Sequence, residues 1–386
     1  MALRHTRRRY LAGLGAVGAA GLAGCAGSPV SLGDGSGGGG GSDGGDSALT
    51  AEPAGPPPDG VPTTGTPPLA DAALPIPGSA GPLRKEVKDV VGKDSIPAVD
   101  DPSFVAPGDA DFLQGGDPVF GVVVNGVARA YPQKVLVWHE IANDTVGGVP
   151  VTVSYCPLTG TAMGFYRGET TFGVSGDLLN NNLVMYDRAT DSRWPQVLAR
   201  AIRGEHRGRS LREFRVVWTT FGRWREVHPD APVLSTDTGY ARDYGRDPYG
   251  QYNPRKDYYA NRNTLFPRLN DDDRLHPKDV VVGARVPANA GPPPYAAAWE
   301  KERLRTEGVV ASDLGGTPHV AVHDPALDAG YVYANPDGLA VETTADGIRV
   351  DGATHPPDDL PLDGVLATDA MWFAWAGFYP DTNLYA

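Results

Sequence analysis

The segment that decides the fold class is residues 119–132, with the sequence VFGVVVNGVARAYP. Two runs rich in β-branched residues, 119–124 and 127–131, flank Asn125-Gly126, a dipeptide that favours a tight two-residue hairpin turn. Pro132 then suits the first position of a helix, because its fixed φ fits there and its missing N–H is not needed. The segment therefore predicts a β-hairpin that leads directly into a helix.

The residues downstream extend this pattern. We expect the helix to run to about Ala142, and residues 149–155 to form a strand whose valines share one face with Tyr155. The opposite face of the strand carries Thr152, Ser154 and Cys156. By i, i+3, i+4 and i+7 spacing, the residues predicted to share one helix face are Leu136, His139, Glu140 and Asn143. With a short helix over 221–227 and further short strands, the sequence predicts a β-rich α+β body whose sheets pack together.

Three sequence matches recur in the same order in the second half of the chain. Residues 119–131 resemble 281–295, and residues 143–150 resemble 312–318. In the second match a proline follows seven positions after each segment ends, Pro157 in one case and Pro325 in the other. The third match has identical spacing and pairs Trp224, His228, Pro229 and Asp230 with Trp375, Tyr379, Pro380 and Asp381. Chance recurrence in a chain rich in Gly and Pro is the alternative, but three ordered matches favour two tandem related repeats packed as one body. Cys156 falls opposite Asp324, so any thiol chemistry belongs to the first repeat.

The first 25 residues have the layout of an export signal. Arg7 and Arg8 precede an apolar, glycine-rich run and resemble a twin-arginine signal, while Leu22-Ala23-Gly24-Cys25 resembles a lipobox. A membrane-spanning helix is the alternative, but the run is too short and too rich in glycine to cross about 30 Å of hydrocarbon. We therefore expect an exported protein, lipidated at Cys25, whose lipid holds it on the outer face of the cell membrane.

The rest of the chain divides into four expected parts. Residues 26–82 consist mostly of Gly, Ser, Pro, Thr, Ala and Asp, and predict a disordered tether. We expect the first repeat, which carries the Cys/His motif, over 83–240, and a tyrosine-rich connecting loop over 241–279. The second repeat, which lacks the cysteine, is expected over 280–386.

The charge of the chain bears on its partners. The 386 residues have a formal net charge of −13, and loss of the four arginines in residues 1–24 brings it to −17. Such a surface repels phosphate backbones, so nucleic acid is not an expected partner. The acidic excess, with arginine far outnumbering lysine, indicates a halophile-like secreted protein or an acidic protein from a high-GC genome.

Several motifs resemble one known family. The motifs are WHEIAND at 138–144, GGVPV at 147–151, YCPLTGTA at 155–162, FGVSG at 172–176 and MYDR at 185–188. They resemble the bacterial and archaeal domain-of-unknown-function family numbered 3179, and the likeness covers about residues 113–386. The resemblance implies no established activity and no cofactor, so reaction, cofactor and enzyme status all stay open at this point.

Three hypotheses account for Cys156 and His139. In the first, Cys156 is a catalytic nucleophile, His139 is its base, and Asn143 or Asp187 orients the imidazole. In the second, Cys156 and His139 bind a metal such as copper, with Met163 or Met185 as a third ligand. In the third, the motif is architectural and the domain is a non-catalytic extracellular binding or scaffold module.

Other polar clusters allow two interpretations each. The amides of Asn180, Asn181 and Asn182 could hold an oxyanion or cap a turn. The carboxylates of Asp271, Asp272 and Asp273 could hold a cation, although a solvated turn is the commoner outcome. We expect the tyrosines of residues 240–259 to pack rather than to stack on a sugar.

Overall fold

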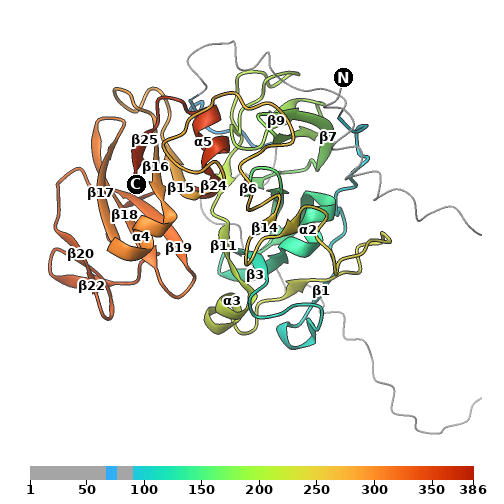
Figure 1. Ribbon diagram of the computed structural model, residues 1–386, viewed down its shortest axis with the longest axis horizontal. Coiled ribbons are helices and arrows are strands. Elements are labelled where there is room, and N and C mark those ends of the chain that lie inside the picture. The colour runs from blue at the N-terminus through green and yellow to red at the C-terminus, as the bar shows by residue number, and fades with distance from the viewer. Residues whose placement is uncertain (1–66, 76–89) are drawn as a thin grey trace, which may run out of the picture.

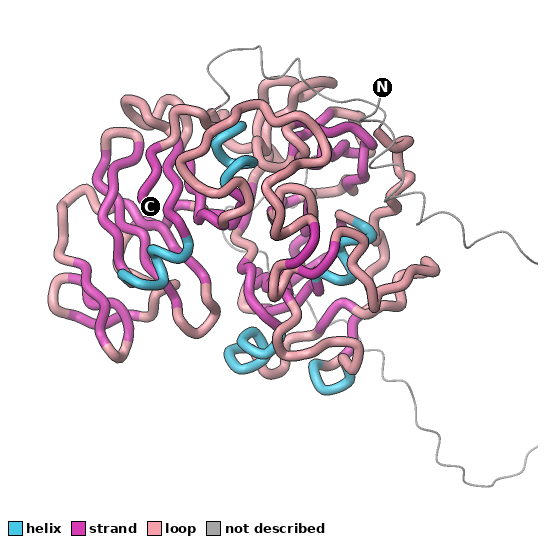
Figure 2. Tube along the Cα trace, in the orientation of Figure 1, coloured by secondary structure: helices cyan, strands magenta, loops and turns pink. Residues whose placement is uncertain are grey.

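The computed structural model describes residues 67–75 and 90–386, in which strands outnumber helices (Figures 1 and 2). Within these ranges there are four α-helices, each of seven residues, and the sheets have two to five strands. The prediction of a β-rich α+β body is confirmed. None of the helices in this part of the chain is long and apolar enough to cross a membrane.

The first half of the body contains the hairpin that the sequence predicts. β2 (Pro118–Val124) and β3 (Val127–Pro132) pair antiparallel, and both turn residues have the positive φ of a tight hairpin, 51° at Asn125 and 76° at Gly126. The hairpin lies in a sheet of order β1-β12-β3-β2-β11, with β1 (Phe104–Val105), β11 (Val217–Thr220) and β12 (Val233–Leu234). A helix follows each of two strands in this sheet: α2 (Gln133–His139) follows β3, and α3 (Phe221–Val227) follows β11.

Two more sheets complete the first half. One has the order β10-β6-β5-β4, with β4 (Ile141–Val146), β5 (Val149–Cys156), β6 (Thr161–Tyr166) and β10 (Glu213–Phe214). The other has the order β7-β8-β9, with β7 (Phe172–Leu179), β8 (Asn182–Asp187) and β9 (Arg193–Pro195).

The second half has sheets of matching strand order, except that β1 has no counterpart there. The first is β24-β15-β16-β25, with β15 (Val280–Arg285), β16 (Ala296–Glu300), β24 (Ala367–Met371) and β25 (Asn383–Tyr385). The second is β17-β18-β19-β23, with β17 (Val309–Leu314), β18 (Thr317–Asp324), β19 (Ala329–Ala334) and β23 (Asp363–Val365). The third is β20-β21-β22, with β20 (Val341–Thr344), β21 (Gly347–Val350) and β22 (Ala353–His355). As in the first half, one helix, α4 (Lys301–Glu307), follows β16 and another, α5 (Trp372–Phe378), follows β24.

A close contact between glycine and tryptophan occurs at the same place in both halves. A Cβ on Gly121 of β2 would lie 2.0 Å from the Trp224 ring of α3, and one on Gly283 of β15 would lie 2.4 Å from the Trp375 ring of α5. Only glycine lets each indole pack this closely on its strand.

The two halves lie side by side, the first in cyan to green and the second in orange to red (Figure 1). The main hydrophobic core contains Tyr155 and Leu158 of the first half together with Trp372 and Trp375 of the second. Backbone hydrogen bonds also cross, since Met371 N donates to Thr159 O over 3.0 Å. The halves therefore share one core.

The predicted helix is shorter than expected. α2 ends at His139, because Glu140 adopts the left-handed conformation with φ 60° and its N–H donates to Leu136 O. β4 then begins at Ile141, so Asn143 lies on a strand rather than on the helix face expected for it. The predicted helix 221–227 is confirmed as α3.

Residues 67–75 fall within the expected tether, yet they pack on the body. Leu69 forms a β-bridge with Leu211, and Leu69 and Leu74 both contact the main core. This part of the tether prediction is wrong, because two leucines supply apolar surface that the overall composition conceals. The rest of the tether lies outside the described residues, as do the export signal with Arg7 and Arg8 and the lipidation site Cys25.

The segment 241–279 connects the two halves. It contains one short hairpin, β13 (Gly250–Gln251) with β14 (Lys256–Asp257), and is otherwise irregular. Its side chains Tyr249, Tyr258 and Tyr259 are buried in the main core, which agrees with the expectation that the tyrosines pack.

Candidate functional site

Cys156 is the last residue of β5, and its side chain is fully buried. Its Sγ donates to Asn181 O over 3.5 Å and accepts from Leu183 N over 3.3 Å. Both contacts come from the β7–β8 hairpin. The thiol therefore lies between the sheet that contains β5 and the sheet that contains β7 and β8. Contacts of this kind suit a protonated structural thiol, whereas reactive cysteines are at least partly exposed.

His139 is equally buried, and both of its ring nitrogens are engaged. Nδ1 lies 2.8 Å from Pro97 O and Nε2 lies 2.7 Å from the Tyr244 hydroxyl. Since a carbonyl can only accept, Nδ1 carries the proton, and Nε2 accepts from Tyr244. Burial lowers the pKa of His139 to about 4, helped by the charge of Arg242 and opposed by the hydrogen bond to Pro97. The neutral imidazole is thus a fixed link between α2 and two loops.

Asn143 and Asp187, the proposed orienting residues, also serve local structure. Asn143 Nδ2 donates to Phe172 O over 2.9 Å, and its Oδ1 accepts from Thr152 Oγ1 over 2.7 Å, which links β4, β5 and β7. Asp187 accepts from Thr190 N and from Trp194 Nε1, which closes the turn after β8. Neither side chain is hydrogen-bonded to His139, whose two ring nitrogens are bonded elsewhere.

The remaining sequence candidates lie in separate places. Met163 and Met185, the proposed third metal ligands, are both buried in the main core. Within residues 67–75 and 90–386, no group of three or more His, Cys, Asp or Glu side chains could hold a metal ion. Asp271 pairs with Arg268 and Asp272 with Arg274.

The three asparagines join distant parts of the chain. Asn180 and Asn181 form the β7–β8 turn, with φ of 52° and 61°. Asn180 donates to Ala374 O in α5, and Asn181 exchanges hydrogen bonds with the backbone of Phe266. Asn182 donates to Gln196 Oε1 over 2.9 Å. The amides are therefore committed to cross-links rather than to an oxyanion.

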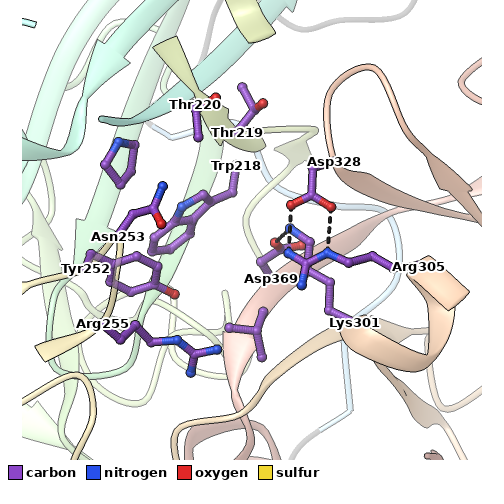
Figure 3. Close-up of a pocket in the computed structure, with 12 residues that line it drawn as sticks. Trp218, Thr219, Thr220, Tyr252, Asn253, Arg255, Lys301, Arg305, Asp328 and Asp369 are labelled. Carbon is purple, nitrogen blue, oxygen red and sulfur yellow. Dashed lines mark hydrogen bonds and ion pairs between the residues drawn. The ribbon is translucent and has the colours of Figure 1, made fainter. Parts of the chain in front are cut away.

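A cavity of about 250 Å³ lies between the two halves, and we call it the inter-half cavity (Figure 3). Its lining comes from three parts of the chain: Pro118, Trp218, Thr219 and Thr220 from the first half; Tyr252, Asn253 and Arg255 from the connecting segment; and Val280, Lys301, Arg305, Asp328 and Asp369 from the second half. Figure 3 shows the residues of the first half and connecting segment facing those of the second. We call its buried lining residues the floor and its exposed lining residues the rim.

The floor of the inter-half cavity is formed by buried residues, among them Trp218, Thr219, Lys301 and Asp369. Lys301 Nζ lies 2.5 Å from Asp369 Oδ2, and each of these side chains is only 7% exposed. Pairing with each other offsets part of the cost of burying a lysine and an aspartate at this depth.

The rim carries two exposed arginines. Arg305 forms a bidentate pair with Asp328, 2.7 Å on each side, and also reaches Glu302. Although burial raises the pKa of the Asp328 carboxyl, hydrogen bonds from His323 and Arg305 outweigh it and hold that pKa well below its usual range. Arg255 donates to the carbonyl of Lys278.

Thr219 and Tyr252 add hydroxyl groups to the lining. Thr219 is 4% exposed, and its Oγ1 is buried without a hydrogen-bond partner. Native proteins satisfy most buried polar atoms, so such a group requires an explanation. Burial also raises the pKa of Tyr252 above its ordinary value, so its phenol remains protonated and able to donate a hydrogen bond.

Sequence reasoning missed this site because it followed the cysteine. Lys301 is the first residue of α4, as Gln133 is of α2, and Asp369 is third from the end of β24, as Trp218 is of β11. Gln133 Nε2 donates to Asp247 of the connecting segment over 2.7 Å. A comparison of equivalent positions in the two halves would have shown that the second half has a charged residue at two places where the first half has an uncharged one. This difference would have indicated the inter-half cavity.

Comparison with known proteins gives one result. No curated protein matches the chain, and no solved structure matches it. The family model described as "Protein of unknown function (DUF3179)" matches residues 93–382, which include most of both halves, the WHEIAND and YCPLTGTA motifs and every residue that lines the inter-half cavity. The chain therefore belongs to the DUF3179 family.

Proposed function

We propose that this protein is an exported, lipid-anchored binding module that holds a small molecule in the inter-half cavity. The observation that carries the proposal is the lining of this cavity, which includes a buried Lys301–Asp369 ion pair and Thr219, whose hydroxyl has no hydrogen-bond partner. Binding sites of small molecules are typically concave, lie between structural units and present a few converging polar groups.

The cavity supports this function better than the Cys/His motif does. A nucleophile and its base must come within hydrogen-bond reach, but His139 has both ring nitrogens committed to Pro97 and Tyr244. The Cys156 thiol is fully buried between sheets. Of the three sequence hypotheses, the non-catalytic binding module is therefore the one we adopt, with the motif as its internal framework.

Export and anchoring rest on the sequence of the first 25 residues. The twin arginines Arg7 and Arg8 and the lipobox ending at Cys25 support transport and lipidation. Labelled fatty acid should enter the wild-type protein, whereas Cys25→Ser should remain unlabelled and appear in the medium. Replacement of both arginines by lysine should keep the protein inside the cell. Fatty-acid labelling of the Cys25→Ser chain would contradict the assignment.

We also propose that the two halves are tandem related repeats. Matching sheet orders, matching helix positions and the glycine–tryptophan contacts support a duplication. In such a duplication the second repeat acquired the charged residues of the cavity, while the first kept the cysteine motif.

The test of binding fills the cavity. Thr220 lines it and is the N-cap residue of α3 without a side-chain capping bond, so Thr220→Trp should block the space without loss of a cap. A library of small metabolites is screened by thermal shift against the full chain. We expect hits that Thr220→Trp abolishes and that Cys156→Ser retains, because a serine hydroxyl can replace both thiol contacts.

Two results would overturn the proposal. Hits lost in Cys156→Ser but kept in Thr220→Trp would return function to the cysteine motif. A screen in which no hit depends on Thr220 would remove the cavity as a binding site. Circular dichroism of both variants shows whether the fold persists.

A further inference from the structure

The charge of the inter-half cavity contrasts with that of the whole chain. Three cationic side chains line it, Arg255, Lys301 and Arg305, against two carboxylates, Asp328 and Asp369, although the chain has a formal net charge of −13. From this lining we infer that the ligand of the cavity is a small hydroxylated organic anion, a carboxylate or a phosphate ester. The inference rests on the function proposed above and names the ligand class.

The size of the cavity limits the ligand. A volume of about 250 Å³ corresponds to roughly eight water molecules at about 30 Å³ each, so the ligand has on the order of ten non-hydrogen atoms. An oligosaccharide or a peptide is too large to enter as a whole.

Arg255 supplies the charge that an anion would neutralise. Lys301 and Arg305 already pair with Asp369 and Asp328, whereas the hydrogen bond that Arg255 makes is to the backbone carbonyl of Lys278. A guanidinium has five N–H donors in a planar fork that matches a carboxylate or phosphate. Because Arg255 is exposed at the rim, it can meet a ligand there.

Thr219 supplies the second contact. Thr219 lines the floor of the cavity and its hydroxyl is buried without a partner, so a rotation of the side chain that turns the hydroxyl into the cavity would let an oxygen of the ligand satisfy it. The Tyr252 phenol is a further donor on the wall.

The two aspartates explain why the ligand also carries hydroxyl groups. Carboxylates only accept hydrogen bonds, and Asp369 and Asp328 retain acceptor capacity after pairing with Lys301 and Arg305. Hydroxyl groups on the ligand can donate to them. An anion without donors would meet these carboxylates with no compensating contact.

The experiment uses four probes that share a three-carbon skeleton. Glycerate and glycerol 3-phosphate are anionic, glycerol is neutral, and 2-amino-1,3-propanediol is cationic. Binding to the full chain, purified from membranes, is measured by calorimetry at constant ionic strength in a chloride buffer. We expect at least one anion to bind about tenfold or more tightly than glycerol and the amine. The two anions together show whether a carboxylate or a phosphate is preferred.

Two variants locate the contact. Arg255→Gln should weaken the anion by about tenfold or more, whereas Arg349→Gln, which removes the same charge from an exposed site on β21, should leave binding unchanged. Thr219→Val keeps the shape of the side chain and removes an unpartnered hydroxyl, so it should maintain or raise the unfolding temperature while it weakens the anion.

The outcomes separate this inference from the proposed function. Tight binding of glycerol or of the amine, abolished by Thr220→Trp, would overturn the ligand class and leave the cavity as a binding site. If neither anion binds at concentrations up to about 10 mM, the proposed ligand class is overturned as well. Anion binding that Arg255→Gln and Thr219→Val leave intact would show that the anion sits elsewhere. If no molecule depends on Thr220, the proposed function itself fails.

Discussion

At the scale of single residues, His139 behaves as a structural group whose protonation the fold resists. Burial of its imidazole disfavours the charged form, and the hydrogen bond that Nδ1 donates to Pro97 O offsets this effect only in part. Tyr244 completes the arrangement, because its hydroxyl donates to Nε2 and accepts from Thr238 Oγ1.

This arrangement predicts a pH-dependent stability. The pKa of His139 is about 4 in the fold against 6.5 for the ordinary group, so between these values the unfolded chain binds the extra proton. The free energy of unfolding should therefore fall as the pH drops from 6.5 to 4, by about 3 kcal/mol in total. Urea unfolding at several pH values measures this slope.

His139→Asn provides the comparison, because asparagine retains a donor for Pro97 and does not titrate. The variant should be less stable at pH 7, and its unfolding free energy should vary less between pH 6.5 and 4. His355→Asn, on the half-exposed strand β22, is the matched control and should keep the wild-type slope. An unchanged slope in His139→Asn would contradict this account.

Cys156 permits a second prediction at this scale. In the Cys25→Ser chain it is the sole thiol, and its Sγ is buried against Asn181 and Leu183. Alkylation should therefore require opening of the structure and be slower than in urea by about a hundredfold or more. Mass spectrometry of the labelled protein follows the reaction. Rapid labelling of folded protein at mildly acid pH would instead indicate a thiolate and revive the catalytic hypothesis.

At the scale of elements, local sequence predicts short-range structure well and contacts at a distance poorly. Asn125-Gly126 predicts the β2–β3 turn correctly, because the preference for positive φ lies in the two residues themselves. The predicted end of the helix, at about Ala142, was wrong, because nothing in the local sequence indicates that Glu140 adopts the left-handed conformation. The strand pairing of Ile141 with Ser154 continues directly from this position and imposes the early end.

The β7–β8 turn yields a prediction that separates backbone from side-chain effects. Asn181→Gly keeps the positive φ but removes the hydrogen bonds to Phe266, at a cost of about 1–3 kcal/mol. Asn181→Ala removes the same bonds and adds strain of about 1 kcal/mol, because alanine disfavours the left-handed region. The unfolding free energies in urea should therefore rank wild type, glycine variant, alanine variant. Equal stability of wild type and glycine variant would show that the cross-link contributes nothing.

At the scale of the whole molecule, no single sequence motif predicts the candidate site. The WHEIAND and YCPLTGTA motifs contain His139 and Cys156, and both side chains are buried and hydrogen-bonded within the fold. The inter-half cavity combines Thr219, Arg255 and Lys301 from three separate parts of the chain, and only the packing of the halves brings them together. The recurrence of sequence between the halves was visible, but their relative placement was not.

The contact between the halves includes a buried ion pair that links β10 to β15. Glu213 Oε1 lies 2.8 Å from Arg285 Nη2, with side chains 7% and 3% exposed. Burial raises the pKa of Glu213, and the charge and hydrogen bond of Arg285 oppose that rise. The pair thus offsets part of the cost of burying a carboxylate at this depth.

Removal of one partner should destabilise the molecule as a single unit. Arg285→Met leaves Glu213 buried without its cation, which should cost about 3–5 kcal/mol at pH 7. Because the halves share one core, the variant should still unfold in one transition, at lower urea concentration, by circular dichroism and by tryptophan fluorescence. The loss should shrink as the pH falls, because protonation of Glu213 removes the unpaired charge. The double variant Glu213→Leu with Arg285→Met should recover most of the stability, since neither charge remains buried. Two separate transitions in Arg285→Met would show that the shared core does not by itself make the halves one cooperative unit. A double variant no more stable than Arg285→Met would show that the unpaired Glu213 charge is not the cause of the loss.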